Sequence, residues 1–336
     1  MLRRMKGAGK GVTLADVARE AGVSSMTVSR ALNRPDIVTA PIRERVQAAV
    51  DALGYIPNRM AGTLAGGGPV RLLPMVLPTL HHSVYVPFLE GVQRGLTQPG
   101  WQLAIDLTEY DPQREWRAAE QFLSLRPDVM VLAGTDHDPR VLPALRRFGV
   151  RIIEVMDAHP DPADLLIGYD HAQAGTMAAR HLIERGYRHL AYASCLGVGD
   201  ARNARRMQAF RAEAERCGVP CAAENVEEPS SYEVGVTLLR RLLTREPGVD
   251  AIYFSNDDVA AGALFECLRQ GLSVPGRVAI LGHNDMSISA HVHPALSTVF
   301  TPREEIGAEV ARRLNAPTLK GGLVTFPCEL RPRQTT

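Results

Sequence analysis

Near the N-terminus, hydrophobic and polar positions repeat at helical spacing in three short stretches. The first helix is predicted to follow the capping residue Thr13, because an apolar i, i+3, i+4 stripe comes next and Gly22 supplies the open backbone of a tight turn. A second helix begins at the cap Ser24, and a third covers roughly 40–53. Three amphipathic helices of this length can close one small core together.

The second helix is predicted to keep its polar residues on the outside. Val28 and Leu32 face inward with Val23. The residues left facing outward are Ser25, Met26, Ser29 and Arg30. An arginine can bond a guanine through two hydrogen bonds, and hydroxyl groups can donate to or accept from base edges. The pattern predicts a helix-turn-helix whose second helix lies in the major groove of DNA; the alternative is an ordinary three-helix domain.

The segment after the third helix favours the DNA-binding interpretation. Pro57 ends that helix, Asn58 can cap a new one, and 59–65 is long enough for about two turns, too few to be stable in water alone. Gly62 weakens such a helix further. We therefore expect the segment to fold on binding, with Leu64 as the apolar side chain that inserts between base pairs from the minor groove.

After three glycines and a proline at 66–69, which form a flexible joint, short apolar runs alternate with helical stretches. Strands are predicted at 70–76, 103–106, 129–133, 152–156, 165–168, 190–193, 251–255, 278–282 and 296–300. Helices are predicted at 85–96, 114–124, 140–148, 172–185, 205–217, 232–244 and 258–270. This alternation is typical of parallel sheets with helices on both faces, and so many strands fit two similar subdomains with a cleft better than one sheet. Ligands of such folds bind at the carboxyl ends of strands.

Composition and charge agree with a two-part protein that binds DNA. The 336 residues suffice for two or three domains, and a hydrophobic content of 45% is ample for packed cores. The net charge of +1 is unevenly placed, because residues 1–68 contain ten Lys or Arg against five Asp or Glu and carry +5, whereas the remainder carries −4. The basic end coincides with the predicted helix-turn-helix, as attraction to phosphates requires.

Cysteine and histidine positions point away from disulfides and metals. The five cysteines form no CxxC pair and are expected to be reduced thiols. His291 and His293 have no third ligand nearby, so we expect no metal and no cofactor. The basic stretch 1–10 lacks the apolar core of a signal peptide, and no apolar run approaches about 18 residues. A cytoplasmic, nucleoid-associated protein without a membrane partner is expected.

Several motifs match one family in sequence order: Thr-Leu-x-Asp-Val-Ala-x-x-Ala-Gly-Val-Ser at 13–24, Thr27-Val28-Ser29-Arg30, Asn33 and Gly54-Tyr55-Ile56-Pro57-Asn58-Arg59. In these motifs, and along nearly its whole length, the chain resembles the LacI/GalR family of bacterial transcriptional regulators. The resemblance implies an N-terminal three-helix helix-turn-helix domain with a hinge helix, then a periplasmic-binding-protein-like pair of doubly wound α/β subdomains. The expected boundaries are a DNA-binding domain at 1–57, hinge helix and linker at 58–69, and an effector-binding and dimerisation domain at 70–336, with an N-subdomain at about 70–168 and 297–326 and a C-subdomain at about 169–296 and 327–336.

The resemblance also implies the DNA contacts. In the family, the positions matching Ser25, Met26 and Arg30 read operator bases, and those matching Ala61 and Leu64 enter the minor groove at the centre of a palindrome. The expected DNA-binding residues are Thr13, Ser24, Ser25, Met26, Thr27, Ser29, Arg30, Asn33, Asn58, Arg59, Ala61 and Leu64. Because one recognition helix reads few bases, we expect a homodimer on a palindromic operator.

Two residues indicate the charge of the effector. Arg206 matches a ligand-binding arginine of the family, and a guanidinium near a helix N-terminus opposes the helix dipole unless an anion binds; a solvated charge is the alternative. Asn284 stands where family members that bind neutral sugars or purines often place an aspartate, so one pocket carboxylate is missing. Together the two residues favour an anionic, polyhydroxylated effector over a neutral sugar.

Loops at other strand ends supply the remaining effector candidates, which are Ser83, Tyr85, Asp157, Ser231 and Asn256. The Asp157 carboxylate could accept hydrogen bonds from sugar hydroxyls while the arginine takes the acid group. Core packing is the alternative for Tyr85, and helix capping is the alternative for Ser231. For Asn256 both roles are open, although we expect one of the two aspartates after it to be the helix cap.

Within the family, the chain is most similar to the gluconate-utilisation repressors. This resemblance rests on the 54–59 motif and on Val155-Met156-Asp157, Ser230-Ser231-Tyr232, Ser255-Asn256-Asp257-Asp258, Phe265-Glu266-Cys267 and the run 296–304. It implies a repressor of sugar-acid catabolism that releases its operator when gluconate or a close sugar acid closes the cleft and the hinge unfolds. The effectors 2-ketogluconate, phosphogluconate and a neutral sugar stay open, and so does whether the effector induces or co-represses.

An enzyme is the alternative of a different class. The chain contains no GxSxG, HExxH or GxxxxGKS/T motif, and the glycine-rich run 7–11 has no strand before it to form a phosphate loop. An exported solute-binding protein would share the cleft fold, but the helix-turn-helix and the lack of a signal peptide argue against it. We therefore expect a regulator without enzymatic activity.

Overall fold

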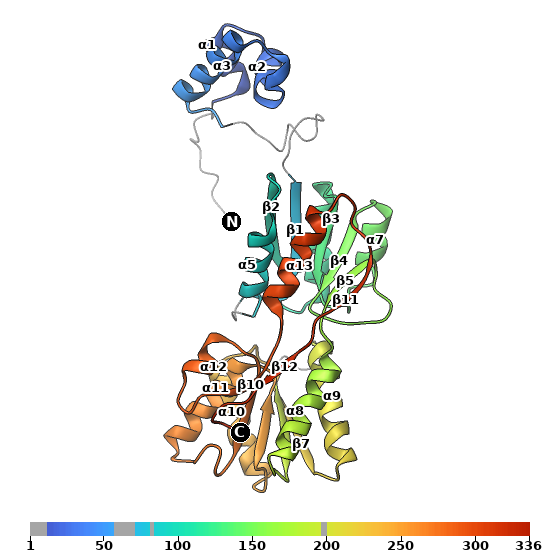
Figure 1. Cartoon of the computed structure of the whole chain (residues 1–336), viewed down its shortest axis with the longest axis vertical. Helices are drawn as coiled ribbons and strands as arrows, with labels where there is room; N and C mark the ends of the chain where they lie inside the picture. Colours follow the sequence, from blue (N-terminus) through green and yellow to red (C-terminus); the bar gives the residue numbers. More distant parts are fainter. Residues whose placement is uncertain (1–11, 57–70, 81–83, 196–199) are drawn as a thin grey trace, which may run out of the picture. The chain divides into compact units, whose positions relative to one another are not determined.

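The computed structural model describes residues 12–56, 71–80, 84–195 and 200–336. Two compact units are present, one formed by 1–71 with 99–102 and the other by 72–98 with 103–336 (Figure 1). The first is helical and the second is an α/β unit. The boundaries of 1–57 for the DNA-binding domain, 58–69 for the hinge and linker and 70–336 for the effector-binding domain stay predictions.

The N-terminal unit consists of short helices joined by tight turns: α1 (Leu14–Ala21), α2 (Ser25–Asn33), the 3-10 helix η1 (Pro35–Ile37) and α3 (Ala40–Leu53). Thr13 and Asp16 form a capping box on α1. The Thr13 hydroxyl accepts a hydrogen bond from the Asp16 N–H (3.3 Å), and the Asp16 carboxylate accepts one from the Thr13 N–H (3.0 Å). Gly22 ends α1 with a φ of +64°, so the predicted cap and turn are confirmed.

One small core holds these helices together. Val17 of α1, Val28 of α2 and Val46 of α3 are buried in it. Burial of a valine side chain stabilises a fold by about 1.5–3 kcal/mol, so three of them account for much of the cohesion of so small a unit. Arg45 adds a polar contact, because its Nη2 donates to the carbonyl of Ala21 at 2.5 Å and fastens α3 to the end of α1.

The α/β unit contains two sheets, which define an N-subdomain and a C-subdomain. The N-subdomain sheet has the strand order β11 (Gly322–Thr325), β5 (Leu165–Gly168), β4 (Arg151–Val155), β3 (Val129–Ala133), β1 (Arg71–Leu77) and β2 (Trp101–Leu107). The C-subdomain sheet has the order β12 (Glu329–Arg331), β10 (Ser297–Phe300), β9 (Ala279–Asn284), β8 (Ala251–Phe254), β6 (Leu190–Ser194) and β7 (Cys221–Asn225). Strand β12 runs antiparallel to β10, whereas β10, β9, β8, β6 and β7 run parallel to one another. The expected doubly wound α/β pair is confirmed.

Helices cover the faces of both sheets. In the N-subdomain they are α5 (Val86–Gly95), α6 (Pro112–Ser124), α7 (Val141–Arg147) and α13 (Arg303–Asn315), and α5 lies beside α13 (Figure 1). In the C-subdomain they are α8 (His171–Glu184), α9 (Ala201–Arg216), α10 (Tyr232–Arg245), α11 (Asp257–Arg269) and α12 (Ser287–His291). Gly175 lets α8 approach α9 closely, because a Cβ there would lie 2.2 Å from the carbonyl oxygen of Arg206. This contact fixes the helix that carries the arginines described below.

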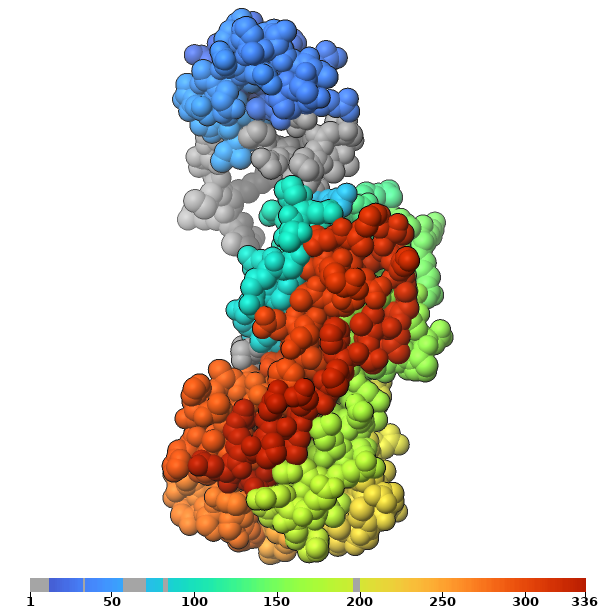
Figure 2. All heavy atoms as spheres, viewed as in Figure 1, coloured from blue at the N-terminus to red at the C-terminus, as the bar shows by residue number. Residues whose placement is uncertain are grey.

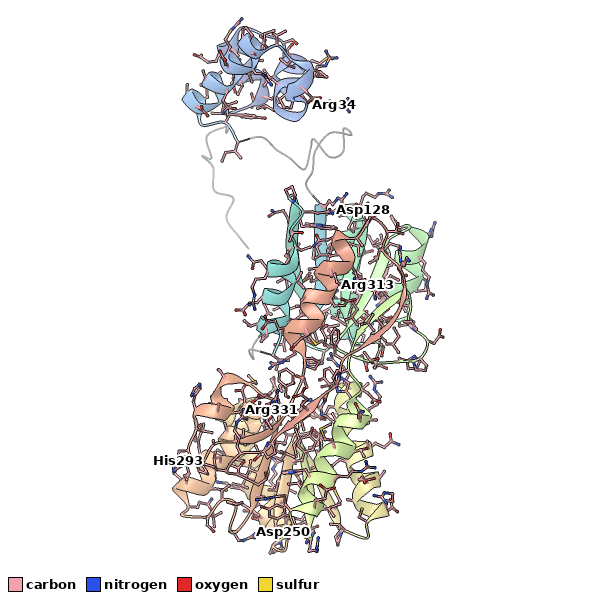
Figure 3. The ribbon with its side chains drawn as sticks, in the orientation of Figure 1. Arg34, Asp128, Asp250, His293, Arg313 and Arg331 are labelled. Carbon is pink, nitrogen blue, oxygen red and sulfur yellow. The ribbon has the colours of Figure 1, made fainter. Side chains whose placement is uncertain are left out.

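The chain passes between the two subdomains after β5, after β10 and between β11 and β12. The C-terminal residues, drawn in red in Figure 2, therefore lie on the visible surface of both subdomains. Figure 3 labels Arg313 on α13 in the N-subdomain and Arg331 on β12 in the C-subdomain. Side chains near these connections can contact both subdomains at once.

The structure corrects the sequence-based boundaries in places. The segment 297–300 was expected in the N-subdomain, but β10 pairs in parallel with β9 of the C-subdomain, so the chain crosses only after Phe300. The predicted strands and helices are otherwise found close to their expected positions. The sequence pattern missed β7, β11 and β12, each an edge strand, and it also missed helices α12 and α13.

Candidate functional site

Helix α2 presents a polar surface, as the sequence predicted. Ser25, Met26 and Arg30 are exposed, and Met26 is 63% exposed. Ser29 is half-buried. An exposed methionine on a helix that also carries an exposed arginine can contact both the apolar and the polar edges of a base pair.

Polar side chains at the helix starts act within the unit. The Ser24 hydroxyl accepts a hydrogen bond from the N–H of Thr27 (3.1 Å) and lies 2.8 Å from the Thr27 hydroxyl, while Thr13 caps α1. Asn33 is the last residue of α2. The remaining DNA-binding candidates lie outside the described residues: Asn58, Arg59, Ala61 and Leu64. Thr13 and Ser24, which the sequence proposed as DNA contacts, therefore also cap α1 and α2.

A cavity of about 560 Å³ lies at the carboxyl ends of strands from both sheets of the α/β unit. This is where such folds are expected to bind ligands, and the volume suits a small molecule. Four of the seven effector candidates from the sequence line it: Tyr85, Arg206, Asn256 and Asn284.

Arg206 lies in the second turn of α9 and is only 5% exposed. Its Nη2 donates to the backbone carbonyl of Ser255 (3.2 Å), and its Nη1 lies 2.8 Å from Nδ1 of His171. Its Nε has no hydrogen-bond partner, and no carboxylate oxygen of the described residues lies within 4.0 Å of the guanidinium. A buried charge without a counter-ion is unfavourable, so this group is suited to an anion in the cavity.

His171 orients Arg206 without neutralising it. Its Nε2 lies 2.9 Å from the carbonyl of Met156 and donates to it, which leaves Nδ1 as the acceptor for Arg206. Burial, together with the neighbouring positive charge of Arg206, holds the pKa of His171 well below its usual value. The imidazole is therefore neutral at physiological pH.

Aromatic and polar side chains form a rigid wall beside the guanidinium. Tyr192, Phe210 and Tyr253 pack against one another with ring centroids 5.3–5.8 Å apart. The Tyr253 hydroxyl lies 2.8 Å from Nδ1 of His283, and burial followed by the charge of Arg206 lowers the pKa of this second histidine well below its usual value. Neutral, hydrogen-bonded side chains of this kind preorganise a binding site.

Arg202 also lines the cavity, and the sequence reasoning missed it. Its Nη1 donates to the hydroxyl of Tyr85 (3.1 Å), and its Nε faces the carboxylate of Asp200 at 3.4 Å. Asp200 is the cap of α9. The charge of Arg202 is thus compensated, whereas that of Arg206 is not. Its i, i+4 spacing from Arg206, which puts both side chains on one face of a helix, was the signal that could have found it.

The two asparagines in the cavity differ in what they offer a ligand. The Asn284 Oδ1 accepts a hydrogen bond from the Thr301 hydroxyl (3.2 Å), and its Nδ2 has no partner among the described residues. The Asn256 Oδ1 caps α11 by accepting from the Val259 N–H (3.0 Å), and its Nδ2 donates to Ser230 (2.8 Å). Asn284 therefore presents a donor to the cavity. The expectation that an aspartate caps α11 is wrong.

Two other candidates, Asp157 and Ser231, do not line the cavity. Asp157 is 1% exposed and pairs with Arg205, while also accepting a hydrogen bond from the Thr135 hydroxyl (2.9 Å). Ser231 caps α10, and its neighbour Ser230 lines the cavity in its place. Ser83 lies outside the described residues. The strand-end position of Asp157 was read correctly, but its carboxylate is taken by an arginine of the other subdomain.

Within the described part of the chain, His291 and His293 included, no group of three His, Cys, Asp or Glu side chains could hold a metal ion. None of the described helices is long and apolar enough to cross a membrane. The described cysteines are free thiols. The arrangement offers one uncompensated guanidinium, one amide donor and several hydroxyls, which can bind a ligand by charge and hydrogen bonds.

An exposed recognition helix in a helix-turn-helix, together with a small-molecule cavity in a doubly wound α/β unit, defines a ligand-responsive DNA-binding regulator. Comparison with known proteins agrees with this class. Residues 13–58 match the model of bacterial regulatory proteins of the lacI family, and residues 179–336 match the periplasmic binding protein-like domain. The chain belongs to the lacI family, and it is a DNA-binding transcriptional repressor of that family.

Its relatives match over almost their full length. The HTH-type transcriptional regulator GntR of Escherichia coli (strain K12) is 35% identical over 313 residues, 93% of each chain. GntR of Pseudomonas aeruginosa is 33% identical over 333 residues, 96% of this chain and 95% of the relative. The ribose operon repressor of E. coli (strain K12) is 30% identical over 323 residues, which cover 92% of this chain and 94% of the relative. These relatives are transcriptional regulators, the class of protein that the sequence predicted.

Solved structures agree on the fold. A LacI family transcriptional regulator from Silicibacter pomeroyi superposes with a TM-score of 0.89 at 31% identity, covering 96% of this chain and 99% of the other. The lac repressor dimer bound to operator and an anti-inducer gives a TM-score of 0.80 at 25% identity. The match covers 97% of this chain and 99% of the other. The helix-turn-helix and the paired α/β subdomains, in this order along the chain, are therefore shared with the family.

Proposed function

We propose that this repressor leaves a palindromic operator when gluconate or a closely related sugar acid binds in the cavity with its carboxylate at Arg206. The observation that carries the proposal is this guanidinium, which is 5% exposed and has no counter-ion among the described residues. A carboxylate would satisfy its charge and the unpartnered Nε together. The similarity to the gluconate-utilisation repressors, and to the two regulators named GntR, supports the same effector class.

The balance of charges favours an effector with a single negative charge. Among the described lining residues, Glu109 is exposed and pairs with Arg114, Glu227 is exposed, and Asp200 compensates Arg202. The buried positive charge left without a carboxylate partner is that of Arg206. The hydroxyls of Tyr85 and Ser230 and the amide of Asn284 are suited to sugar hydroxyls. Gluconate and 2-ketogluconate meet both requirements. Phosphogluconate would bring a phosphate for which the lining offers no second free cation among the described residues.

A neutral sugar is the second candidate, and the 30% identity to the ribose operon repressor is the observation that favours it. Such a ligand would use the hydroxyls and amides but would leave Arg206 buried and unpaired. An unsatisfied buried charged group costs more than one or two lost neutral hydrogen bonds, so the sugar acid is the better fit.

For the DNA side, we propose that Ser25, Met26 and Arg30 read operator bases in each half-site of a homodimer, and that the hinge with Ala61 and Leu64 enters the minor groove. The exposure of the first three residues supports the first part. Effector binding shifts the population toward a state with a weakened hinge, and a hundredfold loss of operator affinity requires about 2.7 kcal/mol of coupling. A repressor of this kind acts at the nucleoid in the cytoplasm.

Calorimetry of the full chain tests the effector. We expect gluconate and 2-ketogluconate to bind, with phosphogluconate weaker and glucose weakest. Arg206→Ala should weaken gluconate binding by at least about a hundredfold, because it removes a charge-assisted contact worth about 3 kcal/mol. Arg211→Ala, an exposed position on the same helix, is the matched control and should bind as the parent does. Equal affinity for glucose and gluconate would reject the sugar-acid effector.

A further inference from the structure

Arg303 is a second buried arginine, and it lies outside the cavity lining. It is the first residue of α13, just after the chain leaves β10, and it is 6% exposed. No carboxylate oxygen of the described residues lies within 4.0 Å of its guanidinium, and its Nε has no hydrogen-bond partner. A buried guanidinium without an ion pair has to be held by other groups, so its remaining contacts show what it does.

These contacts are with the backbone of two residues that line the cavity. The Nη2 of Arg303 donates to the carbonyl of Asn284 at 2.5 Å, and its Nη1 donates to the carbonyl of Val84 at 3.4 Å. Asn284 ends β9 in the C-subdomain, whereas Val84 precedes α5 of the N-subdomain. One planar guanidinium thus touches both walls of the cavity from behind.

The backbone of Asn284 is in a conformation that needs such support. Its φ is +103°, and Asp285 follows with a φ of +51°. A residue other than glycine in such a region costs about 1–3 kcal/mol and persists only where the surroundings hold it. Arg303 holds the carbonyl of Asn284, and the Thr301 hydroxyl holds its Oδ1 at 3.2 Å. With the oxygen taken, the Nδ2 of Asn284 is the group left to face the cavity.

We propose that Arg303 is a positioning residue of the effector site: it fixes the strained bend at Asn284 so that the amide donates to the effector, and it ties this bend to the Val84 wall. The inference rests on the proposed function, because it takes Asn284 as an effector contact. Lysine cannot replace the arginine here. An ammonium group lacks the planar fork that lets one side chain bond two carbonyls in fixed directions.

The test is calorimetry of the full chain with gluconate, using Arg303→Lys, Asn284→Ala and the double variant. Arg303→Lys should raise the Kd at least about fivefold, the loss expected when one hydrogen bond to the effector is misplaced. Asn284→Ala should raise it by a similar factor. In the Asn284→Ala background, Arg303→Lys should add less than about twofold, because the residue through which it acts has gone. Arg312→Lys, exposed on the same helix, is the matched control and should leave the Kd unchanged.

If Arg303 only stabilised the fold, Arg303→Lys would lower the melting temperature and the operator affinity without a specific effect on gluconate binding. Arg303→Lys should keep the operator affinity of the parent. If it lowers the melting temperature, Thr301→Val tests the same positioning through the other contact to Asn284 and should raise the Kd several-fold. An unchanged Kd for gluconate in the folded Arg303→Lys or Thr301→Val variant would overturn the inference. So would an equal rise in Kd from Arg303→Lys in the parent chain and in the Asn284→Ala variant. If the parent chain binds no gluconate and Arg206→Ala changes nothing, the proposed function fails instead.

Discussion

Arg205 and Asp157 connect the two subdomains beside the cavity. We predict that Arg205→Ala lowers the free energy of unfolding far more than Asp157→Asn does. Arg205 lies on α9 and pairs with the Asp157 carboxylate at the end of β4. The Arg205 side chain is 36% exposed, whereas that of Asp157 is 1% exposed. The charge that depends on the pair is therefore the buried carboxylate.

The difference in burial between Asp157 and Arg205 sets the expected loss in the free energy of unfolding for each variant. Arg205→Ala leaves the carboxylate of Asp157 with the Thr135 hydroxyl (2.9 Å) and the Ala158 N–H (2.8 Å) as its hydrogen-bond donors. Breaking a fully buried ion pair costs about 3–5 kcal/mol. In this pair Arg205 is partly exposed to water, so the expected loss is about 1–3 kcal/mol. Asp157→Asn leaves only an arginine that water can solvate, so its cost should stay below about 1 kcal/mol.

The loss of stability caused by Arg205→Ala should depend on pH in one direction. Burial raises the pKa of Asp157, and the charge of Arg205 opposes this rise. Removing Arg205 therefore raises the pKa further. An acid whose pKa is higher in the folded state binds protons preferentially there, so folding is favoured as pH falls through that pKa. The loss caused by Arg205→Ala should be largest at neutral pH and should shrink as the pH is lowered toward the raised pKa of Asp157.

Urea unfolding followed by tryptophan fluorescence measures this directly. The two tryptophans of the chain, Trp101 and Trp116, lie in β2 and α6, so the signal reports on the N-subdomain. We expect the double variant Arg205→Ala/Asp157→Asn to be close to Asp157→Asn alone. Equal destabilisation by the two single variants, or a loss from Arg205→Ala that does not change between pH 7.5 and pH 5, would refute the reasoning.

Two further outcomes follow from the packing and from the hinge. Gly175→Ala should lower the free energy of unfolding by about 1–3 kcal/mol in the same titration, because its Cβ would lie 2.2 Å from the Arg206 carbonyl oxygen and force α8 away from α9; no change would mean that the helices adjust freely. Leu64→Ala should weaken binding to the specific operator far more than non-specific binding, since the minor-groove wedge is lost, and equal losses in a gel-shift titration would count against the wedge.

Local chemistry explains which elements the sequence predicted well. Caps and tight turns depend on neighbouring residues, so Thr13, Gly22 and Ser24 marked the helices of the N-terminal unit correctly. Central strands are buried on both faces and read as continuous apolar runs, as at 129–133 and 165–168. These signals need no knowledge of the rest of the fold.

Two of the missed strands lack such a signal, whereas one missed helix carries it. Strands β7 and β11 lie at sheet edges and are largely exposed or half-buried, so their apolar pattern is weak. Helix α13 is different, because Ile306, Val310 and Leu314 are buried at i, i+4 spacing and that stripe was readable in the sequence. This apolar stripe by itself predicts a helix after β10.

The cavity shows where sequence reasoning about sites ends. Position at a strand end placed Asn284 and Asn256 correctly, and the family match placed Arg206. The same reasoning put Asp157 in the cavity, because spacing along the chain cannot show that Arg205 reaches it from the other subdomain. Partners far apart in sequence are fixed by tertiary packing, so they become visible only in the folded chain.

The most direct test of the account is an operator-release titration with gluconate, using the full chain and Arg206→Ala on the same labelled operator. We predict that both proteins bind the operator equally without effector, since Arg206 lies in the cavity of the α/β unit and not in the helix-turn-helix. Gluconate should release the parent chain, and Arg206→Ala should stay bound at effector concentrations at least about a hundredfold higher. Release of Arg206→Ala at the same gluconate concentration as the parent would contradict the central claim.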